Sequence, residues 1–232
     1  MLEMLWGYSY SETQIGGNSM KKKVISLVAI GMLVLSGCSI GQSIEKQLSE
    51  TLTRMNDSET EYRDTQSKLT ELEQAEQKTF KETMELTKED VDKLLSKVGE
   101  LETLLNDRLA LIDKEEAAMK EAEGFVKELD EIAENASESE SEKILKLKDA
   151  TEKRYALHSA FIDEYKKLAA IQKEFYEMLS AKDVELDELK QKVEEVNGQN
   201  SIVQTAISKF NEATKEVNSL KEDVFSSLEQ EE

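Results

Sequence analysis

The chain has no proline in 232 residues, and this absence constrains its fold more than any other feature. Proline removes a backbone hydrogen bond and clashes with the preceding turn, so a chain without it can form long uninterrupted helices. Between Cys38 and the C-terminus the sequence is rich in Glu, Lys, Leu, Ala and Gln, a composition typical of long helices. The same stretch has only four glycines, at positions 41, 99, 124 and 198. The sequence therefore predicts an all-α fold.

Apolar residues recur at alternating steps of three and four, the spacing of a left-handed helical bundle or coiled coil. This seam divides into four segments of roughly 45 residues, each ~65 Å long as a helix. Four helices of equal length with short joins pack as an elongated four-helix up-and-down bundle. A three-helix spectrin-like bundle and an extended coiled coil are the alternatives. The four segments cover about 43–85, 88–135, 141–182 and 183–228.

Local signals mark where these helices begin and end. Thr87 followed by Asp90 has the spacing of a capping box that opens the second helix. Residues 134–142 alternate serine with glutamate and predict a polar linker whose serines cap the third helix. A weaker break lies near Asp183. The seam keeps its phase across Gly198, which favours one continuous fourth helix over a loop and a fifth element.

The only cysteine ends a lipoprotein export signal. Three lysines at 21–23 precede an apolar run at 24–35 that is shorter than the ~20 residues of a permanent membrane span. Small residues then lead to a thiol that can carry a diacylglycerol lipid. This pattern predicts a protein anchored to the outer face of the cytoplasmic membrane, facing the cell wall. An ordinary secretory signal with an incidental cysteine is the alternative. The lipobox residues are Leu35, Ser36, Gly37 and Cys38.

The export signal also suggests a domain division. Because such a signal begins at the initiator methionine, Met20 is the expected start, and residues 1–19 are read as an untranslated or wrongly assigned leader. Residues 20–37 form the signal peptide, 38–43 the lipidated cysteine and a short tether, and 44–230 the helical bundle domain.

Charge and residue counts exclude several function classes. With 50 acidic and 30 basic residues, the net charge of −20 repels nucleic acid. The single histidine, His158, is expected in the core beside aromatic residues, and a lipidated Cys38 leaves no free thiol. Zinc sites need three or four ligands, and nucleophilic catalysis needs a nucleophile beside a base. We therefore predict a non-enzymatic protein with no catalytic, metal or cofactor site.

Three polar residues fall on the apolar seam. Arg108 and Glu115 lie seven residues apart on the face that carries Leu105, Ile112 and Met119, and Asn200 lies on the fourth seam. Buried polar pairs of this kind can fix helix register at a cost in desolvation. We favour this interpretation for all three over a polar notch that receives a ligand.

The third segment has an unusual charge for this chain. Residues 141–182 contain nine basic and seven acidic residues, whereas the chain as a whole is strongly acidic. The segment is therefore the surface that repels an anionic wall polymer least. Ion pairing with the neighbouring acidic helices is the favoured alternative role of these side chains. The candidate contacts are Lys153, Arg154, Lys166, Lys167 and Lys173.

A family resemblance adds to these residues. The LSGC signal, the acidic helical chain and the stretch NDRLALIDKEEAAMK at 106–120 resemble the cell-wall-binding lipoproteins of Gram-positive bacteria, the YkyA-like family. The most specific part is IDKEE at 112–116, and the resemblance extends from Met20 to the C-terminus. It implies a four-helix bundle outside the membrane, a wall-binding role and no established catalytic residues.

Two functions from different classes follow. The first is a lipid-anchored, non-enzymatic helical protein that binds or spaces cell-wall material, with the membrane and peptidoglycan or wall polymer as partners. The second is an accessory module that docks on a membrane-associated transport or wall-synthesis complex.

Overall fold

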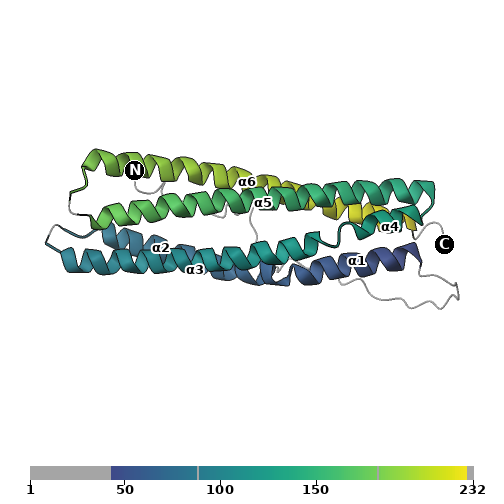
Figure 1. Ribbon diagram of the computed structural model, residues 1–232, viewed down its shortest axis with the longest axis horizontal. Coiled ribbons are helices and arrows are strands. Elements are labelled where there is room, and N and C mark those ends of the chain that lie inside the picture. Colours follow the sequence, from purple (N-terminus) through teal and green to yellow (C-terminus); the bar gives the residue numbers. More distant parts are fainter. Residues whose placement is uncertain (1–42, 88, 182, 229–232) are drawn as a thin grey trace, which may run out of the picture.

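The structure, a computed structural model, describes residues 43–87, 89–181 and 183–228 as a bundle of helices (Figure 1). Within these ranges no strand occurs. The predicted leader, signal peptide and most of the tether, residues 1–42, lie outside the described residues. The helices are α1 (Ile44–Ser58), α2 (Thr60–Met84), α3 (Val91–Glu123), α4 (Glu128–Glu134), α5 (Glu138–Ser180) and α6 (Leu186–Leu228).

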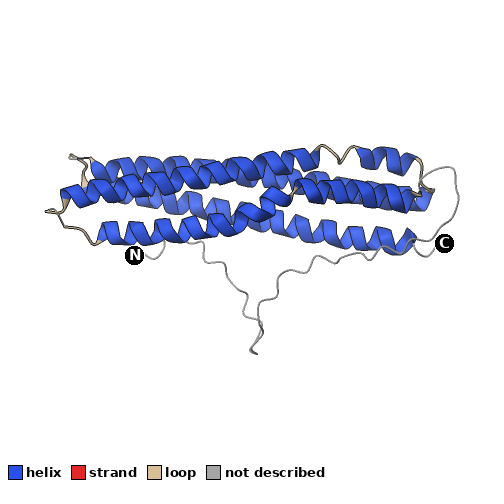
Figure 2. Ribbon diagram, turned by 90° about the horizontal axis from the view of Figure 1, so that it is seen from below, coloured by secondary structure: helices blue, strands red, loops and turns tan. Residues whose placement is uncertain are grey.

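The helices form an elongated up-and-down bundle, which confirms the predicted fold class. The chain runs along α1 and α2, returns along α3 and α4, and then makes a second antiparallel pair with α5 and α6 (Figures 1 and 2). Backbones pack closely within each pair, and α3 against α5 joins the two pairs. We call the end where α2 and α5 end and α3 and α6 begin the tip, and the opposite end, where α1 begins and α6 ends, the α1 end.

The first two predicted helices are each broken, which the seam did not predict. Glu59 interrupts the first between α1 and α2, and residues 124–127 interrupt the second between α3 and α4. Ser58 donates to Glu121 at 3.4 Å, so the two breaks lie at the same level of the rod. In the second break, amides bond carbonyls three residues back, as Val126 does to Glu123 at 3.0 Å. This tighter winding places Val126 and Leu129 in the core.

The other helix boundaries follow the local signals with small shifts. The predicted 134–142 linker is mostly helical, because α5 begins at Glu138 with a capping box between Ser137 and Glu140. Asp90 accepts from the Thr87 amide at 3.2 Å and hydroxyl at 2.8 Å, and α3 starts one residue later. The fourth helix, α6, continues through Gly198, which confirms the prediction of one continuous helix in this segment.

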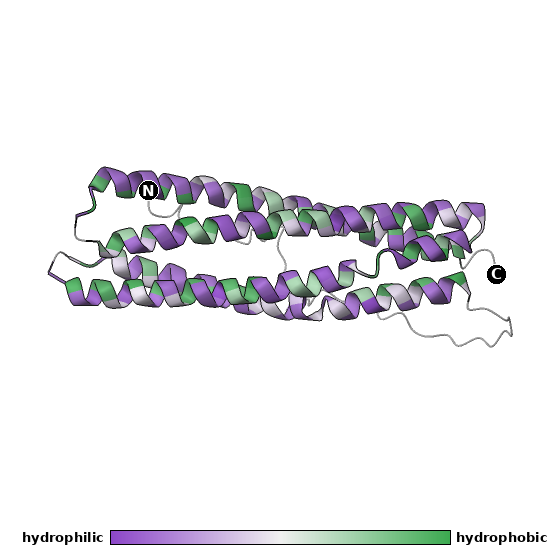
Figure 3. Cartoon of the chain, viewed as in Figure 1, coloured by the Kyte–Doolittle hydropathy of each residue, from purple (hydrophilic) through white to green (hydrophobic). Residues whose placement is uncertain are grey.

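The apolar core consists of two clusters that follow each other along the rod. One, nearer the tip, is built around Leu101, Leu105 and Ile112, and the other, nearer the α1 end, around Leu48, Leu129 and Ile144. These six side chains are at most 1% exposed. Figure 3 shows the remaining helix faces as mainly hydrophilic. Among the described helices, none combines the length and apolar character needed to cross a membrane.

Candidate functional site

Polar side chains from both helix pairs meet inside the bundle in three layers. The first layer surrounds Arg108 of α3, which is only 2% exposed. Its Nε lies 2.8 Å from Oε2 of Glu76 on α2, and its Nη2 donates to Gln172 on α5 at 2.7 Å. Tyr176 of α5 donates to the other Glu76 oxygen at 2.6 Å. This layer ties α2, α3 and α5 together.

The electrostatics of the Arg108 layer are dominated by burial. Desolvation raises the pKa of Glu76 to about 7, although Arg108 and the Tyr176 hydrogen bond act in the opposite direction. Burial likewise raises the pKa of Glu73, which accepts from the Tyr165 hydroxyl at 3.0 Å. Burial disfavours the charged form of a carboxyl group. Glu73 and Glu76 are therefore the main pH-sensitive groups of this layer.

The second layer contains Glu115 and the only histidine. His158 Nε2 lies 2.8 Å from Oε1 of Glu115, and Gln66 donates to Oε2 at 2.8 Å. Glu115 and His158 are 0% and 2% exposed. The imidazole also makes edge contacts with Tyr62 and Phe210. The expected core position of His158 is therefore what the structure shows.

The third layer lies at the level of the two helix breaks. Arg154 of α5 binds Glu59 through two hydrogen bonds of 2.6 and 2.9 Å, and Tyr155 donates to the same carboxylate at 2.6 Å. Arg154 also donates to Thr214 of α6 at 3.0 Å and stacks over the Phe210 ring. The helix break at Glu59 thus coincides with an ion pair between the two helix pairs.

The layers determine what this interior can do chemically. Each buried charge named above has an opposite charge or hydrogen-bond partner from another helix. Sliding one helix pair along the other would separate these partners, and an unpaired buried charge is strongly destabilising. The arrangement therefore opposes changes of helix register. Among the residues that the structure describes, no group of three or more His, Cys, Asp or Glu side chains is placed to hold a metal ion.

Asn200, the third polar seam residue, differs from Arg108 and Glu115. It is 5% exposed, and its Oδ1 has no hydrogen-bond partner among the described residues. Arg108 and Glu115, by contrast, are bonded to neighbouring helices.

The five candidate wall contacts occupy three different environments. Arg154 is in the interior, as described above. Lys153, Lys166 and Lys167 lie on the surface in ion pairs of 2.6 to 2.8 Å. Lys173 is exposed and has no ion pair within the described part of the chain. The ion-pair partners of the three surface lysines include Glu216, Glu116 and Glu164.

The predicted lipobox, Leu35, Ser36, Gly37 and Cys38, lies outside the described residues.

Sequence reasoning missed Glu59, Gln66 and Glu76, which complete the three layers. Glu76 carried a detectable signal, because Leu69, Leu72 and Glu76 follow one another at steps of three and four, the spacing of the apolar seam. Glu59 carried none, since its inward direction depends on the helix break beside it.

Comparison with known proteins assigns the family. A family model described as "Putative cell-wall binding lipoprotein", YkyA, matches residues 43–227. The uncharacterized lipoprotein YkyA of Bacillus subtilis (strain 168) is 29% identical over 194 residues, covering 83% of this chain and 86% of that protein. A 1.6 Å crystal structure of a conserved Staphylococcus aureus protein of unknown function has the same fold, with a TM-score of 0.70 and 23% identity. The structural match covers 78% of this chain and 91% of the Staphylococcus aureus chain. The chain therefore belongs to the YkyA family of lipoproteins.

Proposed function

We propose that this protein is a non-enzymatic, lipid-anchored rod that binds cell-wall material and holds it at a distance from the membrane. The observation that carries the proposal is the direction of the rod relative to the predicted anchor. Cys38 precedes the first described helix by six residues, a reach of at most about 20 Å. Lipid on Cys38 keeps the α1 end near the membrane.

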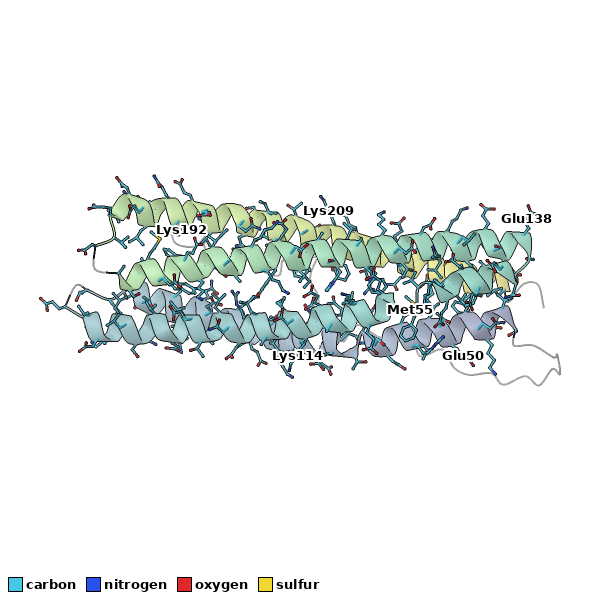
Figure 4. The ribbon with its side chains drawn as sticks, viewed as in Figure 1. Glu50, Met55, Lys114, Glu138, Lys192 and Lys209 are labelled. Atoms are coloured by element: carbon cyan, nitrogen blue, oxygen red, sulfur yellow. The ribbon has the colours of Figure 1, made fainter. Side chains whose placement is uncertain are left out.

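The length of the rod then defines how far it reaches. Helix α5 alone has 43 residues and spans about 65 Å. Glu50 and Glu138 lie toward the α1 end in Figure 4, whereas Lys192 lies toward the tip. With the α1 end at the membrane, the long sides and the tip of the rod are presented to the wall.

Wall contact in this proposal runs along α5. Lys173 has no ion pair with a described residue, and the ammonium groups of Lys153 and Lys167 sit on side chains that are 58% and 61% exposed. Surface ion pairs of this kind contribute little to stability, so an anionic polymer can compete for the lysines. Because each contact is weak, binding is expected to require several lysines and to weaken with salt.

Retention of the full chain on insoluble peptidoglycan, with and without wall teichoic acid, tests this function. Reversing Lys166, Lys167 and Lys173 to Glu should reduce retention and leave helicity unchanged. The matched control reverses Lys190, Lys209 and Lys215 on α6, which changes the total charge equally. Retention should fall toward ~1 M salt, where the screening length is about 3 Å. Equal loss in both triple variants, or no retention by the unmutated chain, would reject wall binding through α5.

A further inference from the structure

The two ends of the bundle differ in how well the core is covered. At the α1 end, Leu48, Leu129 and Ile144 have no exposed surface, and Leu228 is only 6% exposed. At the tip, Val91 is 53% exposed and Leu186 is 66% exposed. The core is therefore closed at one end and open at the other.

The exposed tip residues occupy positions that are buried farther along the same helices. Val91 lies one heptad before Val98, which is 3% exposed, and Leu186 lies two heptads before Asn200, which is 5% exposed. A seam position faces the core wherever neighbouring helices cover it. The apolar seams of α3 and α6 therefore extend toward the tip beyond the part of the bundle where neighbouring helices cover them. Figure 3 shows hydrophobic segments at the starts of both helices.

Exposed apolar side chains are concentrated at this end. Of the six large apolar side chains that are exposed in the described part of the chain, four are at the tip, where Met84 and Leu95 join Val91 and Leu186. Single exposed apolar residues are ordinary on protein surfaces, but a gathering at one end is typical of an interaction site. The other two, Leu145 and Ile202, lie on the long sides and are not neighbours in sequence.

The charges around these side chains indicate the kind of partner. Residues 81–97 and 181–190 contain nine acidic and six basic residues. Of the four lysines whose side chains are described there, those at 93, 97 and 190 are in ion pairs with Asp90, Glu82 and Asp187, and Lys81 is exposed without an ion pair to a described residue. Several exposed carboxylates have no ion pair with any described residue: Glu85, Asp92, Asp183, Glu185 and Glu188. An apolar surface with this rim favours a cationic partner and repels anionic polymers, anionic lipid and a second copy of the same tip.

We propose that the tip is a docking surface for a protein segment that combines apolar side chains with lysine or arginine. The apolar side chains of the partner cover the open core end around Val91 and Leu186, and its basic side chains meet the carboxylate rim. This adds a protein partner to the proposed wall contact along α5 and does not depend on it.

Peptide binding to the full chain, held in nanodiscs of neutral phosphatidylcholine, tests the proposal by fluorescence anisotropy. The probe is a labelled amphipathic helical peptide of leucine and lysine, and its counterpart carries glutamate in place of lysine. The cationic probe should bind and the anionic one should not. In the V91S/L95S/L186S variant, which keeps every charge, affinity should fall at least about tenfold, the equivalent of 1.4 kcal/mol. The L145S/I202S variant is the matched control and should bind within about twofold of the unmutated chain.

Three results would overturn the proposal. If the probe binds V91S/L95S/L186S and L145S/I202S equally well, its binding depends only on the net charge of the chain. Equal binding of the anionic peptide would remove the charge argument. A dimer that depends on the tip residues, detected by analytical ultracentrifugation, would identify a second copy as the occupant. Retention of V91S/L95S/L186S on peptidoglycan should remain normal, so failure of this proposal is distinguishable from failure of wall binding.

Discussion

Glu76 illustrates how a single residue connects stability to pH in this protein. Its side chain has no exposed surface and sits between the Arg108 guanidinium and the Tyr176 hydroxyl. Burial raises its pKa from 4.5 to about 7, so the folded state binds this proton more tightly than the unfolded state. The stability from that protonation is fully present below pH 4.5 and is lost as pH rises through about 7.

Replacing Glu76 with Gln should therefore flatten the pH dependence of stability. Because one pKa unit corresponds to about 1.4 kcal/mol, the loss of unfolding free energy between pH 5 and pH 8 should shrink by about 2.5 kcal/mol. Urea unfolding at the two pH values measures this difference. Exposed Glu194→Gln is the control and should keep the slope of the unmutated chain. The same slope in both variants would contradict the role assigned to Glu76.

Phe210 provides a second test at the residue scale. It is 1% exposed and packs against Tyr62, His158 and Arg154. Phe210→Ala should cost roughly 3–5 kcal/mol, because the surrounding side chains cannot fully close the cavity. Exposed Lys215→Ala should cost almost nothing. Thermal melts followed by circular dichroism compare the two variants, and equal melting temperatures would show that the α6 seam is not a core.

At the scale of elements, helix ends are better determined by local chemistry than helix interiors are. Ser137 and Glu140 satisfy each other's amides at the start of α5, with hydrogen bonds of 2.8 and 3.4 Å. By contrast, nothing local requires α1 and α2 to part at Glu59. There the Glu59 carboxylate binds Arg154 of another helix, so the break belongs to the tertiary structure.

The α5 cap makes a testable prediction at this scale. Ser137→Ala should reduce the unfolding free energy by about 1 kcal/mol, since it removes the side-chain acceptor for the Glu140 amide. Ser139→Ala, at the exposed second residue of the same helix, should have almost no effect. Chemical denaturation measures both. If the two serines are equivalent, the capping box does not stabilise the start of α5.

For the whole molecule, the main consequence of the fold is its direction. The α1 end and the tip lie at opposite ends of the rod, about 65 Å apart along α5. The proposed lipid at Cys38 would therefore lie close to the end whose core is closed and far from the end whose core is open. This polarity connects the proposed anchor with both proposed contact surfaces.

The anchor itself is testable by changing one residue. Cys38→Ala should leave the protein without lipid and its precursor uncleaved by the lipoprotein peptidase, because no thiol remains to accept diacylglycerol. Metabolic labelling with a radioactive fatty acid, followed by electrophoresis, measures this. The unmutated protein should incorporate the label, and normal labelling of the variant would remove the anchor from the proposed function.

The sequence by itself determined the all-α class, the up-and-down bundle and the continuity of α6, because these depend on composition, on the spacing of apolar residues and on chain length. It also singled out Arg108, Glu115 and Asn200, since a polar residue on an apolar seam is visible without a structure. Only the tertiary structure supplied the partners, such as Gln66 for Glu115 and Glu76 for Arg108. These pairs join residues 32 to 49 positions apart, and helical periodicity carries no information about which helices face each other. The aligned breaks at Glu59 and 124–127, and the uncovered seams at the tip, were likewise decided only by how the two helix pairs pack.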